Sequence, residues 1–230
     1  MPKEELPHYA QQTQDLYFHY HFGWGEVCSN SQRGNYDLSQ HSRYSGQDLS
    51  LNGIIPEVVE VSFGVERLML AILEDAYQKE EVIVRNEKKV REILKLSPLL
   101  VPYLVAIIPL PTSRKDETQE KIHTQIQTQA YQLYLDLLKE VSFSITFEKT
   151  NYIGDAYRRQ DAIGTYYCLT VDTLTVNEYL SNGELNPDYE TVTLRHRDTM
   201  KQAEKRISLH NLKNYLNSQY EKYFQEFITS

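Results

Sequence analysis

The sequence is poor in cysteine and glycine and has no long apolar run. Its two cysteines, Cys28 and Cys168, are far apart and lack the spacing of metal ligands, so we expect free thiols in a reducing cytosol. The nine glycines form no phosphate-binding loop. The longest apolar stretch, residues 99–110, contains prolines and is too short to cross a membrane. These absences predict a cytoplasmic protein with no metal site and no membrane contact.

The charge balance is acidic, with a formal net charge of −8 over 230 residues. This balance argues against a protein coated with basic residues, but nucleic-acid binding depends on where the cations cluster, so a local basic face is still compatible with it. No secretory signal is visible in the first residues. The length allows one large or two modest domains.

Residues 56–70 are the most informative segment, because they have the pattern of a strand, a glycine and a helix. Alternation along the strand places Glu60 and Ser62 on one face. Gly64 lets the backbone turn, and the apolar residues after it recur at the spacing of a core-facing helix. Arg67 falls in the first turn of that helix, off its apolar stripe. A carboxylate, a hydroxyl, a bare glycine backbone and a guanidinium suit a small ammonium-bearing substrate beside a phosphate.

The same spacing also fits a structural role with no chemistry. In that alternative a buried strand packs on an amphipathic helix, and Arg67 pairs with Glu66 or Glu74. The histidines His19 and His21 alternate on an aromatic strand but have no acidic or cysteine partner at metal-ligand spacing. Spacing alone favours the structural role, because a strand, a glycine and a helix in succession are common, and it favours ordinary strand histidines over a metal site.

Composition divides the chain into two domains and a connection. We expect a first domain over residues 1–77, in which residues 29–53 form a loop rich in Ser, Asn, Gln and Gly. Residues 78–98 are charged and free of glycine, with proline only at their end, which predicts a helical linker. The second domain then covers residues 99–230.

The second domain alternates strands with helices, which predicts an α/β fold with a mixed sheet flanked by helices. The expected elements are a strand over 103–110, a helix over 117–140, a strand over 141–147, a turn and short helix over 151–163, strands near 166–172 and 190–197, and a terminal helix over about 208–227.

Arginines recur in this domain and predict a basic face. Arg195 and Arg197 share one face of the strand over residues 191–197, and Arg158 and Arg159 lie on the short helix. Guanidinium groups near tyrosines suit single-stranded loop RNA, where bases stack and phosphates are held. The alternative is an internal ion-pair network, in which these arginines are matched by Asp161, Asp172 and Asp198.

Two regions of the chain resemble one known family. Residues 56–68, Pro-x-Val-x-Glu-x-Ser-x-Gly-x-Glu-Arg-Leu, resemble the third signature motif of class II aminoacyl-tRNA synthetases, in the form found in dimeric glycyl-tRNA synthetases. The carboxy-terminal anticodon-binding domain of these enzymes is similar to residues 157–165, 167–172 and 192–200, and further matches are residues 8–10, 22–26 and 36–38. The resemblance implies part of an antiparallel-sheet catalytic domain, followed by an α/β anticodon-binding domain.

The resemblance also implies a chemistry, in which glycine is activated with ATP and Mg²⁺ and passed to its tRNA. It implies that Glu60 and Arg67 are the catalytic residues, with Glu60 holding the substrate ammonium and Arg67 the triphosphate or the adenine. The glycine pocket would be lined by Glu60, Val61, Ser62, Phe63 and Gly64. The ATP side would be formed by Glu26, Val27, Gly64, Val65, Glu66 and Arg67, and Arg158, Arg159, Arg195 and Arg197 would bind tRNA. Positioning and charge stabilisation carry such a reaction.

The chain departs from the family pattern in several places. Val61 stands where the family has proline, Asp155 and Ala156 replace a Lys-Arg pair, and residues 28–35 replace a Gly-Ile-Ala-x-Arg-Thr-Asp pattern. No part resembles motif 1, which builds the dimer, or motif 2, whose arginine grips the α-phosphate. The chain alone is therefore expected to be inactive, and to act with a complementary amino-terminal chain or within a full-length homodimer. The alternative is a non-catalytic nucleic-acid-binding relative, like the accessory subunit of mitochondrial DNA polymerase.

Overall fold

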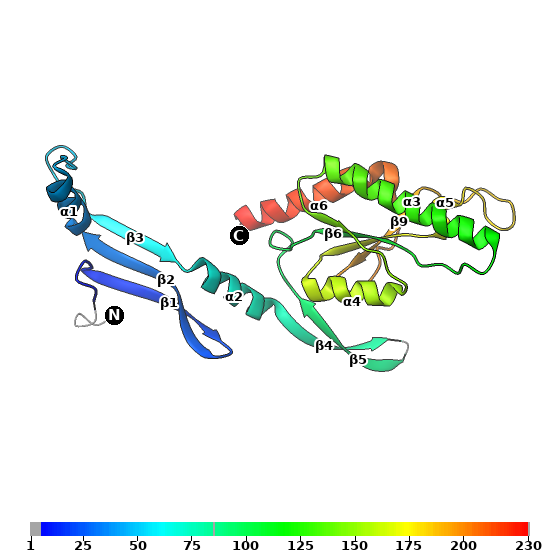
Figure 1. Cartoon of the computed structure of the whole chain (residues 1–230), viewed down its shortest axis with the longest axis horizontal. Helices are drawn as coiled ribbons and strands as arrows, with labels where there is room; N and C mark the ends of the chain where they lie inside the picture. Colours follow the sequence, from blue (N-terminus) through cyan, green and yellow to red (C-terminus); the bar gives the residue numbers. More distant parts are fainter. Residues whose placement is uncertain (1–5, 85, 230) are drawn as a thin grey trace. The chain divides into compact units, whose positions relative to one another are not determined.

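The computed structural model describes residues 6–84 and 86–229, and the chain divides into two compact units, Met1–Asp75 and Ala76–Ser230. The first unit contains a three-stranded sheet. The second contains a five-stranded sheet and a two-stranded hairpin (Figure 1). The boundary expected at residue 77 lies next to this division.

The first unit is an antiparallel sheet in the order β1–β2–β3. Strand β1 (Gln12–Tyr20) pairs with β2 (Gly23–Gly34), and β2 pairs with β3 (Val58–Phe63). Helix α1 (Tyr36–Ser45) follows β2, and helix α2 (Val65–Ala76) follows β3. The strand, glycine and helix predicted over residues 56–70 are therefore present.

The prediction of a loop over residues 29–53 is wrong for much of this range. The segment continues β2 as far as Gly34 and then forms α1, which ends where Gly46 adopts a left-handed φ of +69°. Its Ser, Asn and Gln residues have weak strand preference. However, β2 is the central strand and is paired with a neighbour on each side, and that pairing outweighs the local preference.

The apolar stripe of α2 is exposed at several positions, although the sequence predicted that it faces a core. Val65 is 71% exposed and Met69 62% exposed, whereas Ala71 on the same helix is 6% exposed. Ala71 packs with Tyr20 and Val27 in a small buried cluster. The first unit thus leaves much of its apolar surface uncovered within the part of the chain that the structure describes.

The second unit is an α/β domain with a mixed sheet, as the sequence predicts. The sheet has the order β10–β9–β8–β6–β7, in which β6, β7 and β8 are parallel and β9 and β10 antiparallel. The strands are β6 (Val105–Pro109), β7 (Ile145–Phe147), β8 (Tyr167–Val171), β9 (Thr191–His196) and β10 (Ile207–Ser208). The helices are α3 (Glu117–Glu140), α4 (Ile153–Ile163), α5 (Thr173–Val176) and α6 (Leu209–Thr229).

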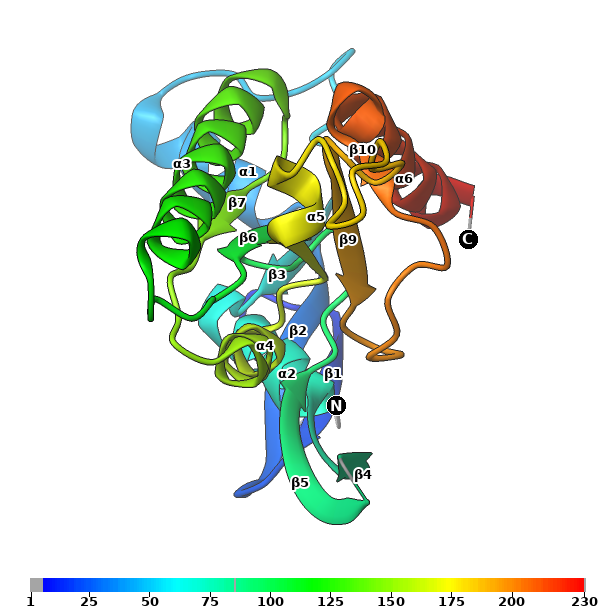
Figure 2. The ribbon, with the colours of Figure 1, turned by 90° about the vertical axis from the view of Figure 1, so that its right-hand side faces the viewer.

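Helices cover both faces of this sheet. On one face α3 and α6 bury Ile126 and Leu212 against strand residues such as Ile107 and Leu169. On the other face α4 places Ala156 in a second cluster with Ala106, Ile108 and Cys168. Figure 1 shows α4 on the opposite side of the sheet from α3 and α6, and Figure 2 shows α5 beside α3. Strand β6 is buried along its whole length, which explains why its sequence is a continuous apolar run.

The prediction of a helical linker over residues 78–98 is wrong, because most of this segment forms a β-hairpin. Strand β4 (Tyr77–Val84) pairs antiparallel with β5 (Glu87–Leu94). Burial alternates along β5, where Arg91 and Ile93 are buried and the residues between and beside them are not. Asn86 takes a left-handed φ of +64° in the turn, a conformation that asparagine tolerates. The packing of alternate β5 residues therefore outweighs the helix preference of the Lys and Glu residues.

No helix in the described part of the chain is both long enough and apolar enough to span a membrane.

Candidate functional site

The strand end of the first unit brings two sequence segments together. Gly64, between β3 and α2, donates its backbone N–H to the carbonyl oxygen of Val27 at 3.1 Å. The Nη1 of Arg67 donates to the carbonyl oxygen of Glu26 at 3.0 Å. The hydroxyl of Tyr20 donates to the carbonyl oxygen of Arg67 at 2.7 Å. Two sets of residues are expected on the ATP side, one in β2 (Glu26 and Val27) and one after β3 (Gly64 and Arg67). The structure brings them into contact at this strand end.

A β-bulge shapes the backbone at this place. Leu16 pairs with Cys28 and Tyr17 pairs with Glu26, so Val27 is an extra residue in β2. Bulges bend a strand and re-aim its groups, and they are over-represented next to active sites. Here the bulged residue is the one whose carbonyl accepts the N–H of Gly64.

Glu60 and Ser62 lie on β3, opposite Ser31 and Ser29 of β2. The carboxylate of Glu60 forms an ion pair with Arg33 and its side chain is 45% exposed. Arg33 orients one carboxylate oxygen, and an ionised carboxylate has further lone pairs that can accept an ammonium. The expected ammonium partner is thus accessible and already oriented.

Sequence reasoning missed Arg33. This side chain links β2 to α1 by donating to both carboxylate oxygens of Asp37, and its guanidinium carbon lies 4.0 Å from the centre of the Tyr9 ring. The hydrogen bonds with Asp37 and then with Glu60 raise the pKa of Arg33, and in turn Arg33 lowers the pKa of Asp37. The matched Tyr-Asp-Leu of residues 36–38 follows Arg33 closely and could have identified it.

The remaining predicted pocket residues do not all share one face. Val61 and Phe63 alternate with Glu60 and Ser62 along β3, and their side chains are 55% and 57% exposed. Val65 and Glu66, in the first turn of α2, are exposed. The structure thus groups Glu26, Val27, Gly64 and Arg67 by direct contact, and Glu60 and Ser62 by strand alternation.

The two strand arginines are inside the second unit, so the expectation that they form an accessible basic face is wrong. Arg195 is 6% exposed and donates Nη1 and Nη2 to the two carboxylate oxygens of Asp161, at 2.8 and 2.9 Å. Burial alone would lower the pKa of Arg195, but the hydrogen bonds and charge of Asp161 raise it. Arg197 is 2% exposed and donates to the carbonyls of Gly164 and Leu96. The alternative of an internal ion-pair network describes these two residues.

The two helix arginines are accessible. Arg158 pairs with Asp155 and Arg159 with Glu148, and the arginine side chains are 70% and 55% exposed. Exposed pairs of this kind contribute little to stability. These guanidinium groups are therefore available to a phosphate at small energetic cost.

No cluster of three or more His, Cys, Asp or Glu side chains is placed to hold a metal ion among the residues that the structure describes.

A protein-family model described as "Anticodon binding domain" matches residues 104–219. This range begins just before β6 and ends within α6. It covers the five-stranded sheet together with α3, α4 and α5.

Similarity to curated proteins extends over both units. The chain is 41% identical over 224 residues to the glycine–tRNA ligase of Mycoplasma mycoides, which covers 95% of this chain and 42% of that protein. It is 40% identical over 220 residues to the glycine–tRNA ligase of Mycoplasmopsis synoviae, with 93% and 42% covered. The corresponding protein of Caldanaerobacter subterraneus is 39% identical over 220 residues. The chain thus spans about two-fifths of the length of these relatives.

A solved structure shares the fold. The prolyl-tRNA synthetase of Giardia lamblia, solved in complex with prolyl-adenylate, matches with a TM-score of 0.60 and 13% sequence identity. The match covers 94% of this chain and 40% of that one. At this identity the likeness establishes the fold and nothing about ligands.

Proposed function

The chain belongs to the family of anticodon-binding-domain proteins, and from this we propose that it is the carboxy-terminal portion of a glycine–tRNA ligase, which attaches glycine to its tRNA with ATP. The observation that carries the proposal is the contact of Gly64 and Arg67 with Val27 and Glu26. The same chain thus contains a site suited to an amino acid and a nucleotide, and a domain whose family is described as anticodon-binding.

The strand end would hold the two small substrates. Glu60 is the proposed partner of the glycine ammonium, with Ser62 on the same strand face and the bare backbone of Gly64 beside them. Val61 and Phe63, whose side chains alternate to the other face of β3, would contribute their backbone to the pocket. A crowded pocket of this kind rejects larger amino acids by steric exclusion.

The nucleotide would lie on the other side of Gly64. Arg67 would hold the triphosphate or stack on adenine, with Glu26, Val27, Val65 and Glu66 beside it. Mg²⁺ would arrive with the phosphates of ATP. These groups position the reactants and stabilise charge without a covalent enzyme intermediate.

The second unit would bind the tRNA of glycine. Arg158 and Arg159 are the proposed phosphate contacts, because their side chains are exposed. Arg195 and Arg197 would act by holding the domain together. A cytoplasmic location is also part of the proposal, in keeping with the two free thiols.

The exposed apolar surface of the first unit supports the need for a further polypeptide. Val59, Val61 and Phe63 of β3 and Val65 and Met69 of α2 are each more than half exposed. Within residues 6–84 and 86–229, β1 and β3 each pair along one edge only. Apolar patches and open edges of this kind recruit a partner. We propose that the rest of a catalytic domain covers them, as an amino-terminal chain or as the earlier part of a dimeric full-length ligase.

Glycine-dependent exchange between ATP and pyrophosphate tests the proposal. The chain is expected to show negligible exchange alone and to restore exchange when combined with the amino-terminal part of a related ligase. Arg67→Ala should lower the restored rate about 100-fold, because single charge-stabilising donors contribute on this scale. Arg43→Ala is the matched control, because Arg43 lies in the last turn of α1 and contacts Tyr44. Exchange that is absent in the combination, or that is equal in the two variants, would refute the assignment.

A further inference from the structure

The sequence contains two Asn-Gly pairs, Asn52-Gly53 and Asn182-Gly183, and neither belongs to the strand-end site. In such a pair the backbone nitrogen of the glycine can attack the side-chain amide of the asparagine, because glycine has no Cβ that restricts the approach. Both pairs are exposed. Solvent access therefore does not distinguish them, and any difference in their reactivity has to come from hydrogen bonding.

Asn52 and Gly53 are the two central residues of a tight turn. The N–H of Leu51 donates to the carbonyl of Ile54 at 2.8 Å, and the N–H of Ile54 donates to the carbonyl of Leu51 at 3.1 Å. Asn52 has a φ of +54° and Gly53 a φ of +77°, as a type I′ turn requires. Among the described residues, neither the side-chain amide of Asn52 nor the N–H of Gly53 has a hydrogen-bond partner. The attacking nitrogen and the amide that it would attack are both free.

This turn is also weakly held by its surroundings. In the described part of the chain, the hydrogen bonds of residues 46–57 are all local and reach back no farther than Ser42. Leu51 and Ile54 are exposed, so little packing fixes the turn. A Cβ placed on Gly53 would meet no atom within 4 Å. The backbone can therefore rotate into the geometry that brings the two reacting atoms together.

Asn182 and Gly183 lie in a turn where the same atoms are engaged. The N–H of Gly183 donates to the carbonyl of Leu180 at 2.9 Å. The amide nitrogen of Asn182 donates to the carboxylate of Glu184 at 2.8 Å, and the amide oxygen accepts from the N–H of Glu184 at 3.1 Å. Attack of Gly183 on Asn182 must first break these hydrogen bonds.

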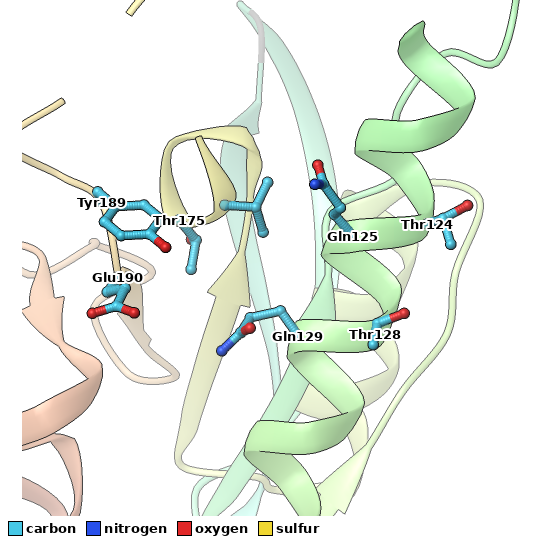
Figure 3. Close-up of a pocket in the computed structure, with 8 residues that line it drawn as sticks. Thr124, Gln125, Thr128, Gln129, Thr175, Tyr189 and Glu190 are labelled. Atoms are coloured by element: carbon cyan, nitrogen blue, oxygen red, sulfur yellow. The ribbon is translucent and has the colours of Figure 1, made fainter. Parts of the chain in front are cut away.

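The segment that carries Asn182 is also held at its base. Buried Asn186 donates its side-chain amide to two backbone carbonyls, one in α5 and one just after it, at 2.8 and 2.7 Å. The N–H of Glu190 donates to the carbonyl of Thr175 at 3.0 Å. Figure 3 shows Glu190 and Tyr189 near Thr175, where all three line a pocket. Among the described residues, no such anchor holds the turn that precedes β3.

We propose that Asn52 is a site of spontaneous deamidation, at which the chain acquires an isoaspartyl residue. The inference goes beyond the proposed function and does not depend on it. The backbone nitrogen of Gly53 gives its proton to hydroxide and attacks Cγ of Asn52. The bond between Cγ and the amide nitrogen breaks, and ammonia leaves with a proton from water, so that a cyclic imide remains. Water then opens the imide at either carbonyl and yields aspartate, or isoaspartate when the main chain passes through Cγ.

Isoaspartate changes the turn that precedes β3. It lengthens the main chain by a CH₂ group and adds a negative charge to an acidic protein. A turn of fixed length does not accommodate the extra group, so the paired hydrogen bonds between Leu51 and Ile54 should open. Strand β3 is paired with β2 from Val58 to Phe63, so Glu60 should keep its place. The exposed isoaspartyl carboxylate is a group that a protein carboxyl methyltransferase can esterify, which defines the chemistry of a partner enzyme.

The test incubates the full chain at mildly alkaline pH, digests it, and follows both Asn-Gly peptides by mass spectrometry as each amide becomes an acid. Asn52 should deamidate about tenfold or more faster than Asn182, because one net hydrogen bond is on the scale of a tenfold change in rate. Incubation in urea, where both turns are unfolded, should bring the two rates together. A native rate at Asn182 that equals or exceeds the rate at Asn52 would overturn the inference, and so would a ratio that urea leaves unchanged.

Two matched variants identify the residue that carries the product. Asn52→Gly keeps the turn, because glycine adopts a positive φ without strain. It should remove most of the methyl groups that an isoaspartate-specific carboxyl methyltransferase adds to the incubated chain. Asn182→Gly makes the same change in the other turn and should leave that signal nearly unchanged. If Asn52→Gly keeps the full signal, Asn52 is not the site and the inference is wrong.

Discussion

Asp161 is the residue whose removal should damage the second unit most. Its carboxylate is 2% exposed and accepts two hydrogen bonds from Arg195. It also accepts one from Nε of Arg91 at 2.9 Å. The single acid thus neutralises guanidinium groups from β9 and β5, and it attaches the β4–β5 hairpin to α4.

The expected effect of Asp161→Asn follows from burial. The variant has nearly the same shape but no charge, so two arginines that are 6% and 4% exposed lose their buried counter-ion. Removing one partner of a buried ion pair costs about 3–5 kcal/mol, here because the charge of Arg195 is left uncompensated, whereas Arg91 keeps its pair with Glu80. For a unit of this size each kcal/mol lowers the melting temperature by about 2–4 °C, so the loss should be about 6–20 °C.

Native-state hydrogen exchange measures this loss in the intact chain. The slowest amides of β8 and β9 exchange through global opening of the unit and report its unfolding free energy. Asp155→Asn is the control, because Asp155 forms an exposed pair with Arg158 on the same helix, and it should cost about 1 kcal/mol or less. A loss for Asp161→Asn no larger than that of the control would refute the argument that this network holds the unit together.

Two further predictions concern single positions in the same unit. Gly164→Ala should lower the unfolding free energy by about 1–2 kcal/mol, because φ is +86° and a Cβ would lie 3.1 Å from the carbonyl oxygen of Leu94. Gly154→Ala, in α4 with open space around it, should instead raise the unfolding free energy by about 0.5–1 kcal/mol. Urea denaturation of the two variants would compare these changes, and equal changes would contradict the reasoning. Burial raises the pKa of the Cys168 thiol to about 12, above its unfolded value of about 8.5. The unfolded chain therefore loses this proton first, and stability should fall as pH rises from about 8.5 to about 10. Cys168→Ala should remove this part of the pH dependence, and denaturation at several pH values would measure it. Above about pH 10 the buried and half-buried tyrosines whose pKa values are also raised add a fall that the variant keeps.

Local sequence patterns predicted those parts of the fold that depend on neighbours in the chain. The apolar run of β6, the periodicity of α3 and the strand–glycine–helix of residues 56–70 are each visible without any distant partner. The residues of the strand-end site could be read for the same reason, since alternation alone places Glu60 and Ser62 together. Family membership was readable from collinear motifs in the two units.

The other features of the fold depend on contacts between residues that are far apart in the sequence. Residues 29–34 form a strand because β1 and β3 pair with them on either side. Residues 77–94 form a hairpin in which Arg91 pairs with buried Asp161 and Ile93 is fully buried. Sequence alternation gave Arg195 and Arg197 a common face, but it could not tell that this face is buried against α4 and the segment near Leu96. The pairing of Arg33 with Glu60 likewise requires two adjacent strands.

The sequence by itself therefore determined most elements of the second unit, the strand–glycine–helix of residues 56–70 and the family, and it named the groups proposed for the strand-end site. Only the tertiary structure decided which charges are inside, because burial and ion pairing depend on residues that are far apart in the chain. Helical and strand periodicity can place a side chain on a face, but what covers that face is set by long-range packing.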